Sequence, residues 1–329
     1  MRSRQRGIAL LTAIILVAVA TIAATAIAWQ SQLSARRGIA VFTIAQSLAL
    51  AEGAEAMAAY ALRDNRQKNP GVVSPGQAWA KPYGPVELDA GAVLEASLED
   101  QAGKFNLNNL VMPATSGAPG AAAPPAALGG VPLVQDPDAV AQFVALLEEL
   151  KIDTQFAARL VDWIDSDSQP TFPGGAEDSF YLGEQPPHRT LNMPLTSISE
   201  LLALGLDRPS YDRLAPFVTA LPVETKLNIC TAPGEVLDAI AGQHSYALDP
   251  QGLRAQRTQF KCYPDKAAYL SSVASSRHDY VDKHVGTDSQ YFRLRTWITI
   301  GTTRFTLYSL LNQDAGGQIR PILRTFGTE

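Results

Sequence analysis

Carboxylates gather in one short stretch of this 329-residue sequence, and carboxylate oxygens can hold hard cations or move protons. The chain has no lysine or arginine between Arg159 and Arg189, but it has six acidic residues there: Asp162, Asp165, Asp167, Glu177, Asp178 and Glu184. Asp165 and Asp167 would follow a helix over residues 156–164, at the end where the helix dipole disfavours anions. A divalent cation would offset that repulsion, and calcium suits an irregular site in an exported protein better than magnesium.

Other interpretations of this acidic segment stay open. The spacing of Asp165 and Asp167 resembles the start of an EF-hand loop, but Pro170 and Ala176 stand where that loop needs its glycine and its bidentate glutamate. A solvated acidic turn without a cation is therefore an alternative. A membrane-anchored metal hydrolase has less support, because His188 is the only histidine nearby and no nucleophile elbow, metalloprotease motif or phosphate-binding loop occurs.

Helical periodicity surrounds the acidic segment. Apolar residues predict helices near residues 139–150 and 156–164, then a third opened by a capping box of Ser197 and Glu200, and a short fourth over 211–218. An Ala/Pro-rich stretch, residues 113–136, comes before them and is too poor in large apolar residues to bury a core. We therefore expect an all-helical insertion domain over residues 137–222.

Strand patterns lie on both sides of this helical stretch. Residues 92–100, 291–300, 302–311 and 319–326 predict an antiparallel sheet, while the Pro- and Gly-rich residues 69–85 predict an irregular connection. Thr231 is expected to cap a helix that has Pro233 in its first turn. The predicted class is α+β. Its expected parts are a leader (1–7), an N-terminal helix (8–65), a first part of the body (66–112), the Ala/Pro-rich loop (113–136), the insertion (137–222) and the remainder of the body (223–329).

The N-terminal helix begins with an uncharged apolar run. Residues 8–29 are long enough to cross a bilayer, and Arg2, Arg4 and Arg6 precede them. A cleaved secretory signal, a plain signal anchor and a prepilin-type leader are all compatible with such a start. The absence of proline before Pro70 favours the third, because the apolar pattern then continues far beyond the membrane. A peptidase would cut between Gly7 and Ile8 and leave the helix in the mature protein.

The charge of the chain limits its possible partners, and its cysteine content bears on the compartment. The net charge is −5, and residues 190–246 carry three basic against six acidic side chains. That balance opposes phosphate binding, although residues 198–221 and 231–242 resemble helix-hairpin-helix elements of DNA-uptake proteins in outline. Cys230 and Cys262 are the only cysteines. In an exported body we expect them to pair and contribute roughly 3–4 kcal/mol, and two buried free thiols are the alternative.

Several motifs together resemble the K minor pseudopilins of type II secretion systems. They are Arg6–Leu11 (RGIALL), Asp100–Leu110 (DQAGKFNLNNL), Asp162–Asp167 (DWIDSD), Gly174–Asp178 (GGAED), Tyr181, Ser199–Leu201 and Asn228–Pro233 (NICTAP). The resemblance covers most of the chain up to about residue 242, with a longer Ala/Pro-rich loop than is usual. It implies a pilin-like α/β body with a large helical insertion, no enzymatic activity, and a structural calcium bound by Asp165, Asp167, Glu177 and Asp178.

The resemblance also implies a place in the cell. The chain would be a single-pass protein of the bacterial inner membrane with its body in the periplasm, cut before Ile8 by the prepilin peptidase and N-methylated there. Its implied partners are other minor pseudopilins, the major pseudopilin and the inner-membrane assembly platform. Secreted substrates are a further candidate partner, and nucleic acid is not one.

Thr12 gives the implied position in the fibre a physical reason. Prepilins usually carry glutamate at the fifth mature position, where it neutralises the amino terminus of a neighbouring subunit inside the apolar core. Counting from Ile8, that position is Thr12 here. A buried charge without a partner costs several kcal/mol, so the lack of glutamate suits a subunit with no neighbour above it. Thr12 therefore points to the tip of the fibre.

Overall fold

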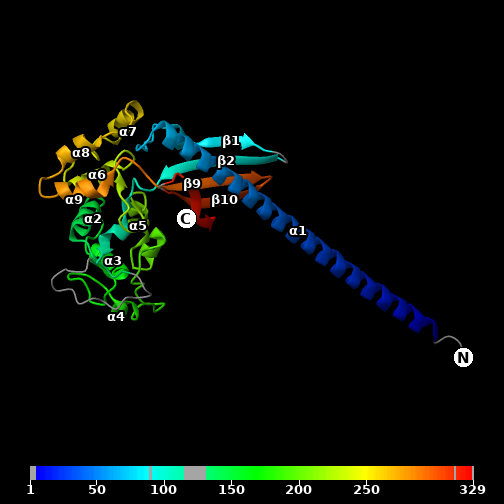
Figure 1. The fold of residues 1–329 in the computed structure, drawn as a ribbon. Coiled ribbons are helices and arrows are strands. Elements are labelled where there is room, and N and C mark those ends of the chain that lie inside the picture. Colours follow the sequence, from blue (N-terminus) through cyan, green and yellow to red (C-terminus); the bar gives the residue numbers. More distant parts are fainter. Residues whose placement is uncertain (1–4, 89–90, 115–130, 315, 328–329) are drawn as a thin grey trace.

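The computed structural model of this protein describes residues 5–88, 91–114, 131–314 and 316–327 (Figure 1). Its first element, α1 (Gln5–Lys68), is one helix of 64 residues, roughly 96 Å long at 1.5 Å per residue. It ends at the sequence Asn69-Pro70-Gly71, where proline cannot donate a helical hydrogen bond and Gly71 takes a φ of 73°. Residues 1–4 of the predicted leader and 115–130 of the predicted Ala/Pro-rich loop lie outside the described residues.

Five antiparallel strands form the sheet of the body, in the order β1-β2-β9-β10-β11. The strands are β1 (Tyr83–Glu87), β2 (Ala92–Asp100), β9 (Tyr291–Ile300), β10 (Thr303–Gln313) and β11 (Ile319–Phe326). The four predicted strands are present. The prediction of an irregular connection up to Pro85 was wrong at its end, because β1 begins at Tyr83 and includes Pro85. Proline is tolerated there because β1 is an edge strand, where a backbone N–H is not required.

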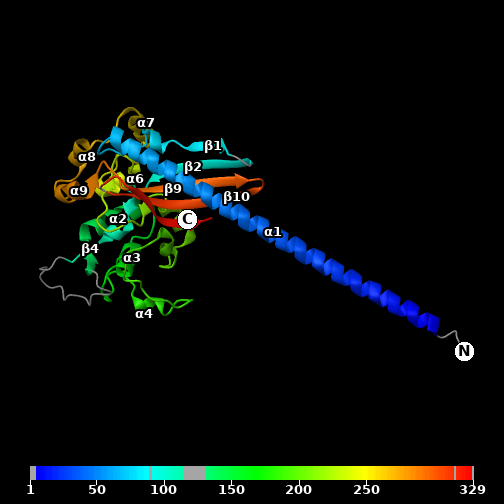
Figure 2. The ribbon, with the colours of Figure 1, turned by 45° about the vertical axis from the view of Figure 1, so that its right-hand side comes forward.

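Helix α1 crosses one face of this sheet with its C-terminal third (Figures 1 and 2). A stripe of small residues at helical spacing, Ala51, Ala54 and Ala58, is buried against the sheet and lets the helix backbone come close. The described side chains before Thr43 are all exposed, including large apolar ones such as Ile22 and Phe42. Among the described residues, α1 is the one helix long and apolar enough to cross a membrane.

Glu55 is the single charged residue within this buried stripe. Its carboxylate accepts two hydrogen bonds from the guanidinium of Arg324 on β11, at 2.9 and 2.6 Å, and one from the Ser309 hydroxyl on β10 at 2.6 Å. Glu55 is 6% exposed, so removing its partners would leave a buried charge unpaired. These hydrogen bonds hold α1 against β10 and the edge strand β11.

We predict that Arg324→Met lowers the free energy of unfolding by about 1–3 kcal/mol, less than for a fully buried pair because Arg324 is partly exposed. Urea unfolding of the full-length protein followed by circular dichroism measures this change. Glu52, an exposed partner 3.7 Å from Arg324, supplies the control: Glu52→Gln should change stability by no more than about 0.5 kcal/mol. Equal effects of the two substitutions would contradict the assignment.

The remaining elements form a helical region beyond one end of the sheet (Figure 1). Its helices are α2 (Pro137–Glu149), α3 (Phe156–Ile164), α4 (Asp178–Tyr181), α5 (Arg208–Leu214), α6 (Gly234–Ala241), α7 (Pro250–Gln259), α8 (Lys266–Ser272) and α9 (His278–His284). Short strands pair between them: β3 (Phe105–Asn106) with β6 (Val218–Thr219), β4 (Val111–Pro113) with β5 (Leu133–Gln135), and β7 (Leu227–Asn228) with β8 (Val285–Gly286). The capping box of Ser197 and Glu200 is present, but it opens a 3₁₀ turn, residues Ile198–Leu202.

One hydrophobic core serves the whole helical region. It includes Phe143 of α2 and Leu160 of α3, and equally Leu237 of α6, Tyr269 of α8 and Val281 of α9. Helices on both sides of residue 222 therefore share their buried surface. The division of the chain into separate domains stays a prediction.

Around α6 one prediction holds and one fails. Cys230 and Cys262 form a disulfide bond across a sequence separation of 32, as predicted for an exported body. The expected cap of Thr231 on the following helix was wrong. Its hydroxyl donates instead to Asp100 Oδ2 at 2.6 Å, and α6 begins at Gly234 with no side-chain cap. Asp100 is buried and needs such donors, so tertiary pairing outweighs local capping here.

Candidate metal centre

The acidic segment follows α3, whose apolar face anchors it. Leu160, Val161 and Ile164 are fully buried, and Asp165 leaves the helix as its C-cap residue in an extended conformation. The chain then turns through Asp167 and returns to Glu177, which precedes α4. The rigid end of a packed helix thus positions one carboxylate, and the returning loop brings the others to it.

Asp165, Asp167 and Glu177 come together at this point. Each offers one carboxylate oxygen, and the three oxygens lie within 4.8 Å of one another. Asp165 and Glu177 are 4% exposed, whereas Asp167 is open to solvent. Oδ1 of Asp165 and Oε1 of Glu177 are buried without a hydrogen-bond partner. Acceptor oxygens that are buried, unpaired and mutually close are the donor set that a hard cation requires.

Burial and mutual repulsion change the proton affinity of this cluster. Loss of hydration, and then the charges of Asp167 and Asp162, raise the pKa of Asp165 to about 7. Loss of hydration, and then the charges of Asp162 and Asp165, raise the pKa of Glu177 to about 7. Without a cation these groups therefore hold protons near neutral pH, and a bound cation would displace them.

A pH dependence follows for the metal-stripped protein. The folded pKa values exceed those of the unfolded chain, so the folded state binds more protons between about pH 4 and pH 7. The free energy of unfolding is therefore highest below the unfolded pKa values and falls as the pH rises through about 7. Urea unfolding at pH 5 and pH 8 measures the loss. The double variant Asp165→Asn, Glu177→Gln should lose most of this dependence, and an unchanged slope in that variant would contradict it.

Asp162 holds the loop between Asp167 and Glu177 in place, a role that was not predicted. It is fully buried, and both of its oxygens accept the Thr171 backbone N–H, at 3.0 and 3.1 Å. A Cβ on Gly175 would collide with this carboxylate and with the Thr171 backbone, so the loop can close only over glycine. The available signal was spacing: Asp162 lies in the last turn of α3, three residues before Asp165.

Asp178, the fourth predicted ligand, points elsewhere. Its Oδ1 accepts from the backbone N–H and the hydroxyl of Thr190, at 3.0 and 2.9 Å, and its Oδ2 lies 3.8 Å from Arg189. The structure therefore brings three of the four predicted ligands together. Asp178 instead fastens the start of α4 to the chain that follows it.

Unpaired buried atoms concentrate around this centre. In the part of the chain that the structure describes, eight buried side-chain atoms lack a hydrogen-bond partner, and six of them belong to residues 159–192. Besides the two carboxylate oxygens they are Arg159 Nε, Tyr181 OH, His188 Nε2 and Asn192 Oδ1. Buried polar groups are nearly always paired, so these atoms indicate hydrogen-bond or ligand partners that the described chain does not itself supply. The acidic cluster could bind a metal ion.

The predicted processing residues lie at the start of α1. Gly7 and Ile8 are within the helix, and the Ile8 side chain is 67% exposed. Thr12 is exposed too, and its hydroxyl donates to the Ala9 carbonyl at 3.0 Å. Thr12 therefore satisfies its own polar group inside an apolar helix and leaves no charge to neutralise.

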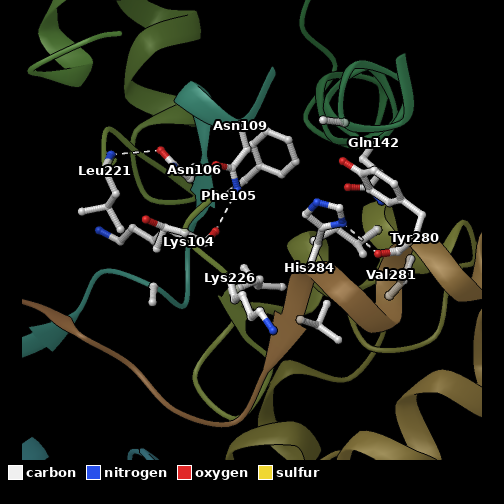
Figure 3. Close-up of a pocket in the computed structure, with 16 residues that line it drawn as sticks. Lys104, Phe105, Asn106, Asn109, Gln142, Leu221, Lys226, Tyr280, Val281 and His284 are labelled. Carbon is white, nitrogen blue, oxygen red and sulfur yellow. Dashed lines mark hydrogen bonds between the residues drawn. The ribbon is translucent and has the colours of Figure 1, made fainter. Parts of the chain in front are cut away.

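A second concavity lies between the chain that follows β2 and α9 (Figure 3). Its cavity volume is about 30 Å³, room for about one water molecule, whereas small-molecule sites occupy roughly 300–1,000 Å³. The Leu221 N–H donates to Asn106 at 2.9 Å, and His284 Nδ1 lies 2.8 Å from the Tyr280 carbonyl. The chain that follows β2 and α9 pack closely against each other here, and we assign no ligand to this cavity.

Comparison with known proteins decides the family. The chain is 34% identical over 340 residues to the type II secretion system protein K of Pseudomonas aeruginosa, with 99% of this chain and 94% of that protein covered. This chain belongs to the type II secretion system protein K family. It is also 31% identical over 342 residues to the protein K of Aeromonas hydrophila, with 98% of both chains covered. The family model for type II secretion system protein K matches residues 103–223.

The fold agrees with a solved protein K. The structure resembles a chain in the crystal structure of the GspK-GspI-GspJ complex from the type 2 secretion system of enterotoxigenic Escherichia coli. The TM-score is 0.72 at 28% identity, covering 89% of this chain and 100% of that one. The predicted α+β class is confirmed, and members of the protein K family are non-enzymatic minor pseudopilins. The matched residues 103–223 include the candidate metal centre and the hairpin-like stretch 198–221.

Proposed function

We propose that this chain is the tip subunit of a type II secretion pseudopilus, where it helps to initiate and cap the fibre for protein export across the outer membrane. The observation that carries the proposal is α1: an apolar helix exposed from Ile8 to Phe42, with Thr12 at the fifth position after the proposed cleavage site. An uncovered apolar helix of this length requires a membrane or neighbouring helices. Thr12 has no charge that could neutralise the amino terminus of a neighbouring subunit, which suits a subunit that has no neighbour on its outer side.

Similar proteins support a set of partners. The relative from enterotoxigenic Escherichia coli was solved in a complex with GspI and GspJ. We therefore propose that this chain assembles with the corresponding minor pseudopilins, with the major pseudopilin below them and with the assembly platform in the inner membrane. In this arrangement the chain is a single-pass inner-membrane protein with its body in the periplasm, and secreted substrates are further candidate partners.

We propose calcium as the ion of the acidic cluster. Asp165, Asp167 and Glu177 supply three carboxylates on an irregular loop, and calcium accepts six to eight oxygen ligands in flexible geometry. Magnesium prefers a stricter octahedral shell with several retained waters, which a mostly buried cluster accommodates less well. The ion would join the end of α3 to the start of α4. Its role is structural, and Asp178 stays in the proposed set only if the loop rearranges on binding.

Processing gives the decisive test of the anchor. We predict that protein purified from membranes begins at Ile8 with a methylated amino group, as intact-mass spectrometry can show. Gly7→Asp should leave the leader uncut. Labelling of sheared pseudopili should then find the protein at one end of each fibre. A mature start at Ile27 or Trp29 would remove the helix and the proposal with it, and uniform labelling along fibres would remove the tip placement alone.

A further inference from the structure

The acidic cluster supplies fewer ligands than the proposed calcium ion requires. Asp165, Asp167 and Glu177 bring one oxygen each to within 4.8 Å of one another, whereas calcium takes six to eight oxygen ligands. Asp162 is close to the cluster, but both of its oxygens already accept the Thr171 backbone N–H. One more carboxylate would add repulsion to a cluster that already holds three. A further protein ligand is therefore expected to be a neutral oxygen.

Asn192 carries such an oxygen. Its Oδ1 is enclosed and has no hydrogen-bond partner among the described residues. Its Nδ2 donates to the Asp167 backbone carbonyl at 2.9 Å. Because a carbonyl oxygen can only accept, this hydrogen bond fixes the orientation of the amide and leaves Oδ1 as the unpaired atom. An enclosed amide oxygen without a donor indicates a partner that the described chain does not itself supply.

The backbone places Asn192 over the end of α3. Its N–H donates to the Trp163 carbonyl at 3.0 Å, in the last turn of that helix, and Asp165 is the C-cap residue. Since Nδ2 binds Asp167, Asn192 is tied to the chain on both sides of Asp165. Its φ of 47° lies in the left-handed region, which asparagine tolerates better than most residues. These contacts hold the amide next to the segment that carries both aspartates.

We propose that Oδ1 of Asn192 is a fourth protein ligand of the ion bound by Asp165, Asp167 and Glu177, an inference that rests on the calcium proposed above. Three carboxylates already oppose the two positive charges of calcium with three negative ones, and the charge of Asp162 acts on the same cluster. A neutral amide oxygen adds a ligand without adding charge, and asparagine carbonyls are ordinary calcium ligands. The same amide would then bind the ion with its oxygen and hold the Asp167 backbone with its nitrogen.

Terbium luminescence tests this assignment in the full-length protein in detergent micelles. Terbium(III) occupies calcium sites, and Trp163, two residues before Asp165, can sensitise its emission. Emission lifetimes in ordinary and heavy water count the water molecules on the ion, and displacement by calcium gives the calcium affinity. Asn192→Gly removes the amide and keeps the left-handed backbone without strain. We expect it to gain about one bound water, because water fills a vacated position on the ion, and to bind calcium at least about tenfold more weakly.

A second variant separates a ligand from a structural hydrogen bond. Asn192→Asp keeps an oxygen in place of Oδ1 and tolerates a positive φ, but it cannot donate to the Asp167 carbonyl. If Asn192 is a ligand, this variant should carry no more bound water than the native protein. If the amide only supports the loop, both variants should lose affinity equally and neither should gain water. Thr190→Val is the matched control, because it removes a nearby hydroxyl that donates to Asp178, and its water count should stay native.

The possible results distinguish this assignment from the calcium proposal itself. A native protein that binds the ion, together with an unchanged water count in Asn192→Gly, would overturn the role of Asn192 and leave the carboxylate site intact. An equal gain of water in Thr190→Val would also overturn it, because the gain would then not be specific to the amide oxygen. A native protein that binds neither terbium nor calcium would overturn both.

Discussion

Removal of calcium is expected to lower the melting temperature of this protein by about 5–10 °C. A ligand present at one hundred times its dissociation constant adds about 2.7 kcal/mol to the free energy of unfolding, and a domain of this size gains roughly 2–4 °C per kcal/mol. The physical source is the pair of unpartnered oxygens on Asp165 and Glu177, which the ion would coordinate. Thermal unfolding at pH 7.5 with excess calcium and with chelator measures the difference.

Two variants make this result specific to the acidic cluster. Asp167→Asn keeps the shape of an exposed ligand but removes its charge, and it should abolish most of the calcium response. Asp178→Asn is the matched control, because that carboxylate binds Thr190, and it should keep the response. An equal loss in both variants would mean that the loop rearranges to include Asp178. Identical melting with calcium and with chelator in the native protein would exclude a structural calcium.

Loss of the disulfide is expected to have the second large effect. Opening the link across 32 residues returns conformational entropy to the unfolded chain, worth roughly 4 kcal/mol in the chain-entropy model, or about 10 °C in melting temperature. Cys230 is fully buried beside Ile229, whose carbonyl holds Arg257. The variant Cys230→Ser, Cys262→Ser and the native protein can be compared by urea unfolding in calcium.

The site of the damage should be local. Hydrogen exchange in the serine variant should rise first over residues 229–263, the segment that the disulfide and Arg257 jointly hold. Exchange at the α1–sheet contact around Glu55 is the internal control and should stay unchanged. A variant as stable as the native protein would contradict an entropic role, and uniform acceleration across the sheet would contradict a local one.

The parts of the fold that were predicted are those with a clear local pattern. The apolar run from Ile8 and the lack of proline before Pro70 predict α1, and partial alternation predicts β2. Runs rich in Thr, Ile, Leu, Phe, Tyr and Arg, with glycines between them, predict β9, β10 and β11. Strand β1 was missed because Pro85 normally excludes a strand, and only its place at the sheet edge makes it tolerable. Thr231 has the residue type of a helix cap, yet the buried Asp100 recruits its hydroxyl, a demand that no local pattern reveals.

The candidate metal centre was also predicted only in part. Charge density and motif resemblance predicted Asp165, Asp167 and Glu177 as ligands, and the structure places these three residues together. Asp162 looked like one more acidic residue, because its burial depends on how α3 packs. Asp178 looked like a ligand, because its hydrogen bonds to Thr190 depend on where the chain returns twelve residues later. Sequence spacing therefore locates the cluster, and tertiary packing decides which carboxylates face it.

The pairing of Glu55 with Arg324 has a mechanical consequence. Helix α1 has no proline along its length and enters the body as one straight rod, so a thrust applied at its membrane end travels along the axis without a hinge. The short side chains of Ala51, Ala54 and Ala58 pack on the sheet without interlocking, so they resist sliding of α1 only weakly. The bidentate hydrogen bonds from Arg324 to Glu55 oppose that sliding, and they transmit axial force from α1 to the edge strand β11.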